Sequence, residues 1–129
     1  MGLDLSKIKY ASLNGRQQEN FNFQKVSGYL ADYGFNCLKL SDDWQGADFL
    51  ACHINGSDFL KVQLKGRMVI DPKYASKEIY IAFLHGPHCY LYPHDEVRDR
   101  IYDLGYEFVA RSWSRLPKWA VSLLEDYKL

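Results

Sequence analysis

Asn55 and Gly56 separate two stretches with β-strand character, and this pair constrains the fold more than any other feature of the sequence. An Asn-Gly pair strongly favours a tight hairpin, because both central positions of a type I′ turn require positive φ. If these two residues alone form the turn, strands 47–54 and 57–67 pair so that the numbers of partner residues sum to 111. The sequence therefore predicts an antiparallel hairpin with a defined register.

This register predicts a group of polar side chains on one face of the hairpin. Asp48 lies opposite Gln63, and Lys65 follows two residues later on the same face. Side chains of directly opposed residues are close enough to interact. Mg²⁺ prefers oxygen ligands, which the Asp48 carboxylate, the Gln63 amide and the backbone carbonyl of Leu64 can supply. A lysine beside such an ion can position an attacking water or neutralise a reacting phosphate.

The remaining pattern predicts an α+β fold. Helical spacing of apolar residues predicts helices over 16–33, over 95–104 and from Pro117 onward. Strands are expected over 35–40, 78–84, 88–92 and 106–111, with a turn at 41–43 and a loop at 68–77. Strands in the middle and helices at the ends indicate a mixed or antiparallel sheet flanked by helices.

Glu19 precedes Phe23 by one helical turn on the apolar stripe of the first predicted helix. A carboxylate there would point toward the sheet and approach the polar group of the hairpin. The alternative is that Glu19 only stabilises the first turn of the helix through the helix dipole.

Length, charge and cysteine content limit the classes of protein. The 129 residues with 47% hydrophobic content predict one globular domain over 1–129. A net charge of zero excludes a general electrostatic attraction to nucleic acid, so a site for polyanions requires local clustering. Three cysteines without an export signal, and no long apolar run, favour a cytoplasmic protein that does not enter a membrane.

The helix and hairpin resemble the PD-(D/E)xK nuclease superfamily, which has a restriction-endonuclease-like fold. The motif is matched by Gly46-Ala47-Asp48-Phe49 and by Val62-Gln63-Leu64-Lys65. Asp48 and Lys65 correspond to the aspartate and lysine of the motif, and Glu19 corresponds to the helix glutamate of many members. Gln63 replaces the usual acid, as in the QxK variant of some active members, and this puts metal affinity in question. Over residues 16–92 the pattern is similar to Holliday-junction-resolvase-like and intron-encoded members.

The resemblance implies a restriction-endonuclease-like core, with a mixed central sheet in the order αβββ then ββαβα. It implies an endonuclease dependent on Mg²⁺ or Mn²⁺ that hydrolyses phosphodiesters of duplex or branched DNA. Because so small a chain offers little surface to a duplex, a homodimer is expected. The alternatives are a catalytically inactive relative that binds nucleic acid or protein, and an unrelated α+β binding domain.

Basic residues around the motif provide candidate phosphate contacts, which position nucleic acid without reading its bases. These residues are Lys61, Arg67, Lys73 and Lys77. A second candidate surface has basic side chains interleaved with tryptophans that can stack on bases: Arg111, Trp113, Arg115, Lys118 and Trp119. For this second group, solvated charges over tryptophans of the core are an equally good interpretation.

A zinc site is the competing metal hypothesis. His85, His88 and Cys89 are close in sequence, and Cys52-His53 lies in the hairpin. Zinc sites have three or four ligands at defined spacing, and the sequence contains neither a CxxC pair nor an HxxxH pair. Turn residues and core cysteines are therefore the preferred interpretation.

Overall fold

The structure is a computed structural model that describes residues 2–129. Its α-helices are α1 (Gly15–Ala31), α2 (His94–Asp103) and α3 (Lys118–Leu124), with short 3₁₀ helices η1 (Tyr10–Ser12), η2 (Pro72–Tyr74) and η3 (Glu125–Tyr127). Its strands are β1 (Phe35–Trp44), β2 (Ala47–His53), β3 (Phe59–Leu64), β4 (Met68–Ile70), β5 (Ile79–His85), β6 (His88–Pro93) and β7 (Arg111–Trp113). The predicted α+β class and the order αβββ then ββαβα are confirmed, with β4 as an additional strand.

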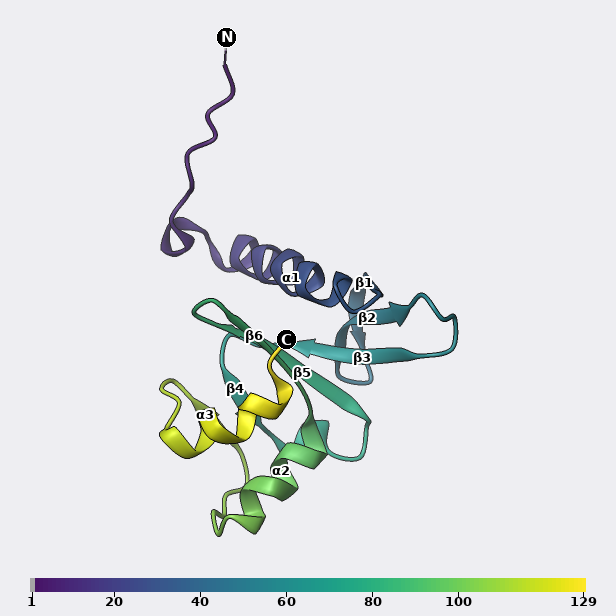
Figure 1. Cartoon of the computed structure of the whole chain (residues 1–129), viewed down its shortest axis with the longest axis vertical. Coiled ribbons are helices and arrows are strands. Elements are labelled where there is room, and N and C mark those ends of the chain that lie inside the picture. Colours follow the sequence, from purple (N-terminus) through teal and green to yellow (C-terminus); the bar gives the residue numbers. More distant parts are fainter. Residues whose placement is uncertain (1) are drawn as a thin grey trace.

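Five strands form a mixed sheet in the order β1-β2-β3-β5-β6. Only β3 and β5 run parallel; the other neighbouring pairs are antiparallel. Helix α1 covers one face of this sheet, and α2 and α3 lie on the other side (Figure 1). The expected helix and three-strand meander of a restriction-endonuclease-like core are present as α1, β1, β2 and β3. Within residues 2–129, no helix is both long and apolar enough to cross a bilayer.

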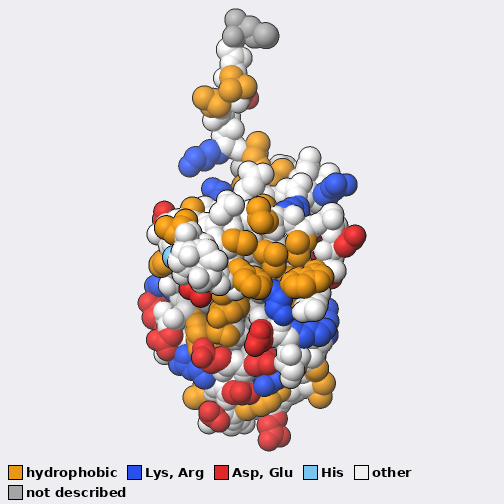
Figure 2. All heavy atoms as spheres, turned by 90° about the vertical axis from the view of Figure 1, so that its right-hand side faces the viewer, with side chains coloured by type: hydrophobic (Ala, Val, Ile, Leu, Met, Phe, Trp, Pro, Cys, Tyr) orange, Lys and Arg blue, Asp and Glu red, His pale blue; other side chains and the backbone are white. Residues whose placement is uncertain are grey.

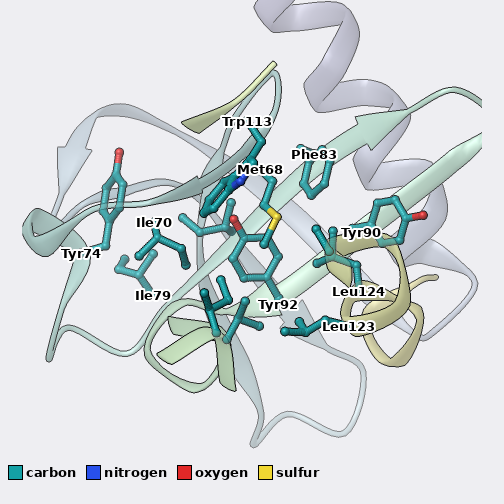
Figure 3. Close-up of a cluster of buried hydrophobic side chains, with 14 of the residues drawn as sticks. Met68, Ile70, Tyr74, Ile79, Phe83, Tyr90, Tyr92, Trp113, Leu123 and Leu124 are labelled. Carbon is teal, nitrogen blue, oxygen red and sulfur yellow. The ribbon is translucent and has the colours of Figure 1, made fainter. Parts of the chain in front are cut away.

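Each face of the sheet has its own hydrophobic core. Between α1 and the sheet, Val26 and Leu30 pack against buried residues of the strands, including Phe49 and Val62. On the opposite face, the side chains of β5 and β6 pack against α2, α3 and the small sheet (Figure 3). Alternate residues of β3 therefore face different surroundings: Val62 faces α1, and Gln63 faces away from it.

Helix α1 begins where the sequence contains a capping box. The Asn14 side chain accepts a hydrogen bond of 2.9 Å from the Gln17 N–H, and the Gln17 side chain accepts one of 2.9 Å from the Asn14 N–H. These two bonds satisfy donors that a helix N-terminus otherwise leaves free. Gly34, at φ 86°, follows the helix and allows the chain to turn directly into β1.

The predicted register of the β2–β3 hairpin is confirmed, but the predicted turn type is wrong. Pairs from Phe49 with Val62 to Cys52 with Phe59 all have numbers that sum to 111. Gly56 has φ 76°, whereas Asn55 is not among the residues with positive φ. Residues 54–57 form a four-residue loop, and Asn55 Oδ1 accepts hydrogen bonds from the backbone N–H groups of Ser57 and Asp58. Two-residue and four-residue loops with the same centre give the same register, so the prediction survived this error.

The predicted turn at 41–43 is also wrong, because β1 continues to Trp44. The turn into β2 lies instead at Gln45 and Gly46, with φ values of 51° and 86°. Trp44 pairs with Ala47 across these two residues, as in a type I′ hairpin. The tight turn expected at the second hairpin therefore occurs at the first.

Two corrections concern the second half of the chain. The expected loop at 68–77 contains β4, and the strand expected over 106–111 lies at Arg111–Trp113 as β7. These strands pair with each other, Met68 opposite Trp113, in a separate two-stranded sheet. The buried Tyr92 hydroxyl joins this sheet to β6: it accepts a hydrogen bond of 2.9 Å from the Val69 N–H and donates one of 2.6 Å to the Val69 carbonyl.

Candidate functional site

Asp48 is held across the β2–β3 hairpin by its own carboxylate. The Leu64 N–H donates a hydrogen bond of 2.9 Å to Asp48 Oδ2. The backbone pairing of β2 with β3 ends at Phe49 and Val62. Beyond this pair, the Asp48 side chain accepts the hydrogen bond of the Leu64 N–H in place of a backbone carbonyl. The Asp48 carboxylate is therefore fixed beside the segment that contains Gln63 and Lys65.

Gln63 is buried and lacks a partner for its amide oxygen. Its side chain is 9% exposed, and Oε1 has no hydrogen-bond partner among the described residues. The register places this side chain on the same face as Asp48. Leaving a buried acceptor unsatisfied costs about 1–3 kcal/mol. A buried amide oxygen without a hydrogen-bond donor is suited to act as a neutral ligand of a hard cation such as Mg²⁺.

Asp43, which the sequence pattern did not single out, lies beside Asp48. Its carboxyl is close enough to interact with the Asp48 carboxyl as a hydrogen-bonding group. The residue belongs to the irregular part of β1 that was expected to be a turn. Gln45-Gly46 was the signal that could have revealed it, because an X-Gly pair after a polar run also permits a hairpin turn.

The surroundings of Asp48 raise the pKa of its carboxyl to about 6. Burial is the largest cause, since it disfavours the charged form. The Leu64 N–H acts in the opposite direction, while the carboxyls of Asp43 and Glu19 raise the pKa further. A carboxyl in this position is ready to exchange its proton for a cation near neutral pH.

Lys65 directly follows β3, and its ammonium lies near the ring of Tyr74. Its N–H donates a hydrogen bond of 2.9 Å to the Ala82 carbonyl of β5, which fixes its backbone. Its ammonium lies 5.4 Å from the centre of the Tyr74 ring, and the Lys73 ammonium lies 5.2 Å from the same ring. Tyr74 stands at the edge of the core cluster in Figure 3. Both ammonium groups therefore lie near the Tyr74 ring, whose faces attract cations.

Glu19 is exposed, in contrast to its expected place on a buried stripe. The buried residues of α1 are Val26 and Leu30. Glu19 is close enough for its charge to raise the pKa of Asp48, although it is the smallest of the causes. The alternative role at the first helical turn is also unsupported, because that turn contains no acidic residue.

The predicted phosphate contacts separate into groups. Lys61 and Lys77 line a hollow of about 380 Å³ together with Gln45 and Glu78. Lys61 also donates a hydrogen bond of 3.3 Å to Gln45 Oε1. Lys73 lies near Lys65 through the shared contact with Tyr74, and Arg67 is exposed just after it. One group of basic residues thus lies beside Gln45, and another beside Tyr74.

The tryptophans of the second candidate surface have mainly a structural role. Trp113 is 4% exposed and belongs to the core, and Trp119 packs against it. Trp119 also stacks on Tyr106, with 4.5 Å between ring centres. Arg111, Arg115 and Lys118 are exposed. Because the tryptophan faces are already occupied by protein, the arrangement favours solvated charges over a core.

The zinc hypothesis gains no support. His85 and His88 pair across the turn between β5 and β6 and are exposed, whereas Cys89 is buried. Burial raises the pKa of the Cys89 thiol to about 12, which opposes the thiolate that zinc requires. Residues 2–129 contain no group of three His, Cys, Asp or Glu side chains placed to hold a metal. A cation at Asp48 would therefore need the Gln63 amide, a backbone carbonyl and water in addition to carboxylates.

Comparisons with known proteins find one similar structure. No family model and no curated protein matches the sequence. Among solved structures, a bacterial homing endonuclease, I-Ssp6803I, is similar over 88% of each chain, with 16% sequence identity and a TM-score of 0.49. At this level of similarity, the chemistry of the site has to follow from the residues of this chain.

Proposed function

We propose that this protein is a metal-dependent endonuclease that hydrolyses DNA phosphodiester bonds, with Mg²⁺ or Mn²⁺ as its cofactor. The observation that carries the proposal is the Asp48 carboxylate, bonded to the Leu64 N–H beside the buried, unpartnered oxygen of Gln63. Asp48, Gln63 and the backbone carbonyl of Leu64 would hold the ion. Glu19 would reach it directly or through water, as the resemblance to PD-(D/E)xK nucleases implies.

The remaining residues have separate tasks in this mechanism. When bound, the ion lowers the pKa of a water and neutralises charge that develops on the phosphate. Lys65 would orient the attacking water or stabilise the charged phosphate in the transition state. Lys61, Arg67, Lys73 and Lys77 would bind phosphates of the DNA backbone on either side. A homodimer would present two such sites to the two strands of duplex or branched DNA.

Cleavage of supercoiled plasmid and of branched DNA, each with Mg²⁺ or Mn²⁺, tests this proposal. We expect the wild-type chain to cut, and Asp48→Ala or Lys65→Ala to reduce the rate by at least about 100-fold, since each removes a group at the reacting phosphate. Asp42→Asn and Lys25→Ala are matched controls at exposed positions, and they should keep the activity. Thermal unfolding of each variant distinguishes loss of chemistry from loss of fold.

A second candidate function is a module that keeps the fold and binds nucleic acid or protein without cutting. Gln63 in place of an acid favours it, as do the exposed apolar side chains Leu38, Trp44 and Phe59 of the first three strands. Figure 2 views this side of the molecule and shows hydrophobic groups beside basic ones. Wild-type protein that binds DNA but never cuts, with either metal and several substrate shapes, would establish this alternative and contradict the nuclease proposal.

A further inference from the structure

Strand β1 contains a large bulge, and it lies directly opposite Asp48. Lys39 pairs with Phe49, and Trp44 pairs with Ala47. Four residues of β1, numbers 40–43, therefore face a single residue of β2. A bulge bends its strand and redirects its side chains, and bulges are frequent next to active sites. After this bulge, β1 pairs with β2 again at Trp44. The residue just before Trp44 is Asp43, whose carboxyl lies beside that of Asp48.

The two carboxyls meet without a compensating cation. Asp43 and Asp48 are within hydrogen-bonding reach, yet neither forms an ion pair with a basic residue among residues 2–129. The lysines of adjoining segments have other partners. Lys39 donates to Asn20, Lys61 donates to Gln45, and Lys65 lies on Tyr74. Two carboxylates in contact require either a shared proton or a cation between them.

A buried oxygen beside this pair points to the cation. Gln63 Oε1 is fully enclosed and has no donor within the described chain. A proton shared between Asp43 and Asp48 would leave this acceptor unsatisfied. A divalent ion would satisfy both carboxylates and the amide oxygen together, because Mg²⁺ and Mn²⁺ accept one or two carboxylates with neutral oxygens and water.

We propose that Asp43 supplies the second carboxylate of the metal site, in place of the acid that Gln63 cannot provide. The inference rests on the proposed metal-dependent function and adds a ligand from a third strand. The interaction with Asp48 is what selects Asp43 over its neighbour. Both aspartates are exposed, but Asp43 is the one whose carboxyl interacts with that of Asp48. In this arrangement the negative charge that Gln63 of β3 does not carry is supplied by Asp43 of β1.

Titration of the full-length chain with Mn²⁺, followed by EPR of the free ion, tests this assignment without requiring activity. We expect Asp43→Asn to weaken Mn²⁺ binding at least tenfold and Asp42→Asn, its matched control, to leave binding unchanged. Adding Gln63→Glu to Asp43→Asn should restore affinity to within about threefold of wild type, since it returns the missing carboxylate to β3. Circular dichroism and urea unfolding check that each variant is folded.

The outcomes separate this inference from the proposed function. If the wild type binds Mn²⁺, Asp48→Asn abolishes binding and Asp43→Asn behaves like Asp42→Asn, the Asp43 assignment is wrong while the metal site stands. If Gln63→Glu fails to rescue a folded Asp43→Asn variant, the idea of compensation between the two strands is contradicted. If the wild type binds no Mn²⁺, the proposed metal-dependent function fails together with the assignment.

Discussion

Two polar side chains of the candidate site, Asp48 and Gln63, lack favourable partners within the described protein. Asp48 is partly buried beside a second carboxyl, and the amide oxygen of Gln63 has no partner. Both features lower the stability of the metal-free fold, and the proposed cation would relieve both. The sequence predicted Asp48 and Gln63 from strand register alone. Asp43 was missed because an alternating pattern does not encode the number of residues in a bulge, and because the turn at Gln45-Gly46 was not recognised.

The raised pKa of Asp48 predicts a pH-dependent stability of the metal-free protein. The folded state binds this proton more tightly than the unfolded state, so the carboxyl costs nothing below about pH 4, and its cost grows as pH rises to about 6. Asp48→Asn should therefore stabilise the protein at pH 8 by about 1–2 kcal/mol, because solvent screening reduces the full effect of the shift, and have little effect at pH 4. The asparagine oxygen can still accept the Leu64 N–H.

Urea unfolding in the presence of a chelator measures this difference. Asp42→Asn is the control, since its exposed carboxyl should show no comparable dependence on pH. An equal effect of Asp48→Asn at both pH values would mean that the carboxylate is not destabilised in the folded state.

At the scale of elements, local sequence patterns predicted the longer helices and strands but not the short strands that pair distant segments. The periodicity of α1 and the β character of β2, β3, β5 and β6 were sufficient to place these elements. The hairpin register was right because a loop centred between Asn55 and Gly56 defines it regardless of loop length. Strands β4 and β7 were missed or misplaced, because three residues are too few for a periodic signal and their pairing joins distant segments.

The turn before β2 gives an element-scale prediction. Gly46→Ala should destabilise the protein by about 1 kcal/mol or more, because φ at this position is 86° and an L-residue is strained there. Gly28→Ala is the matched control. Gly28 lies within α1 at negative φ, with open space around an added methyl group, so the same substitution should stabilise by about 0.5–1 kcal/mol.

Urea denaturation of both variants checks these opposite signs. Gly46→Ala should also weaken Mn²⁺ binding, since this turn closes the bulge that holds Asp43. A stabilising effect of Gly46→Ala would mean that the chain does not form the type I′ turn at this position.

At the scale of the whole molecule, each face of the sheet carries its own core and its own covering elements. Helix α1 covers one face, whereas α2, α3 and the small sheet cover β5 and β6 on the other (Figure 1). Asp43, Asp48 and Gln63 come from three successive strands at the end where β1 bulges. Side chains in this position are held rigidly because they belong to neighbouring strands of one sheet.

The position of a bound ion decides whether Asp48, Gln63 and Asp43 form a metal site. Crystals of the full-length protein grown with Mn²⁺ would reveal the ion by its anomalous scattering. We predict a peak within about 2.5 Å of an Asp48 carboxylate oxygen and of Gln63 Oε1, with Asp43 on the same ion. A peak elsewhere, or none at these oxygens in a protein that cuts DNA, would contradict the proposed site.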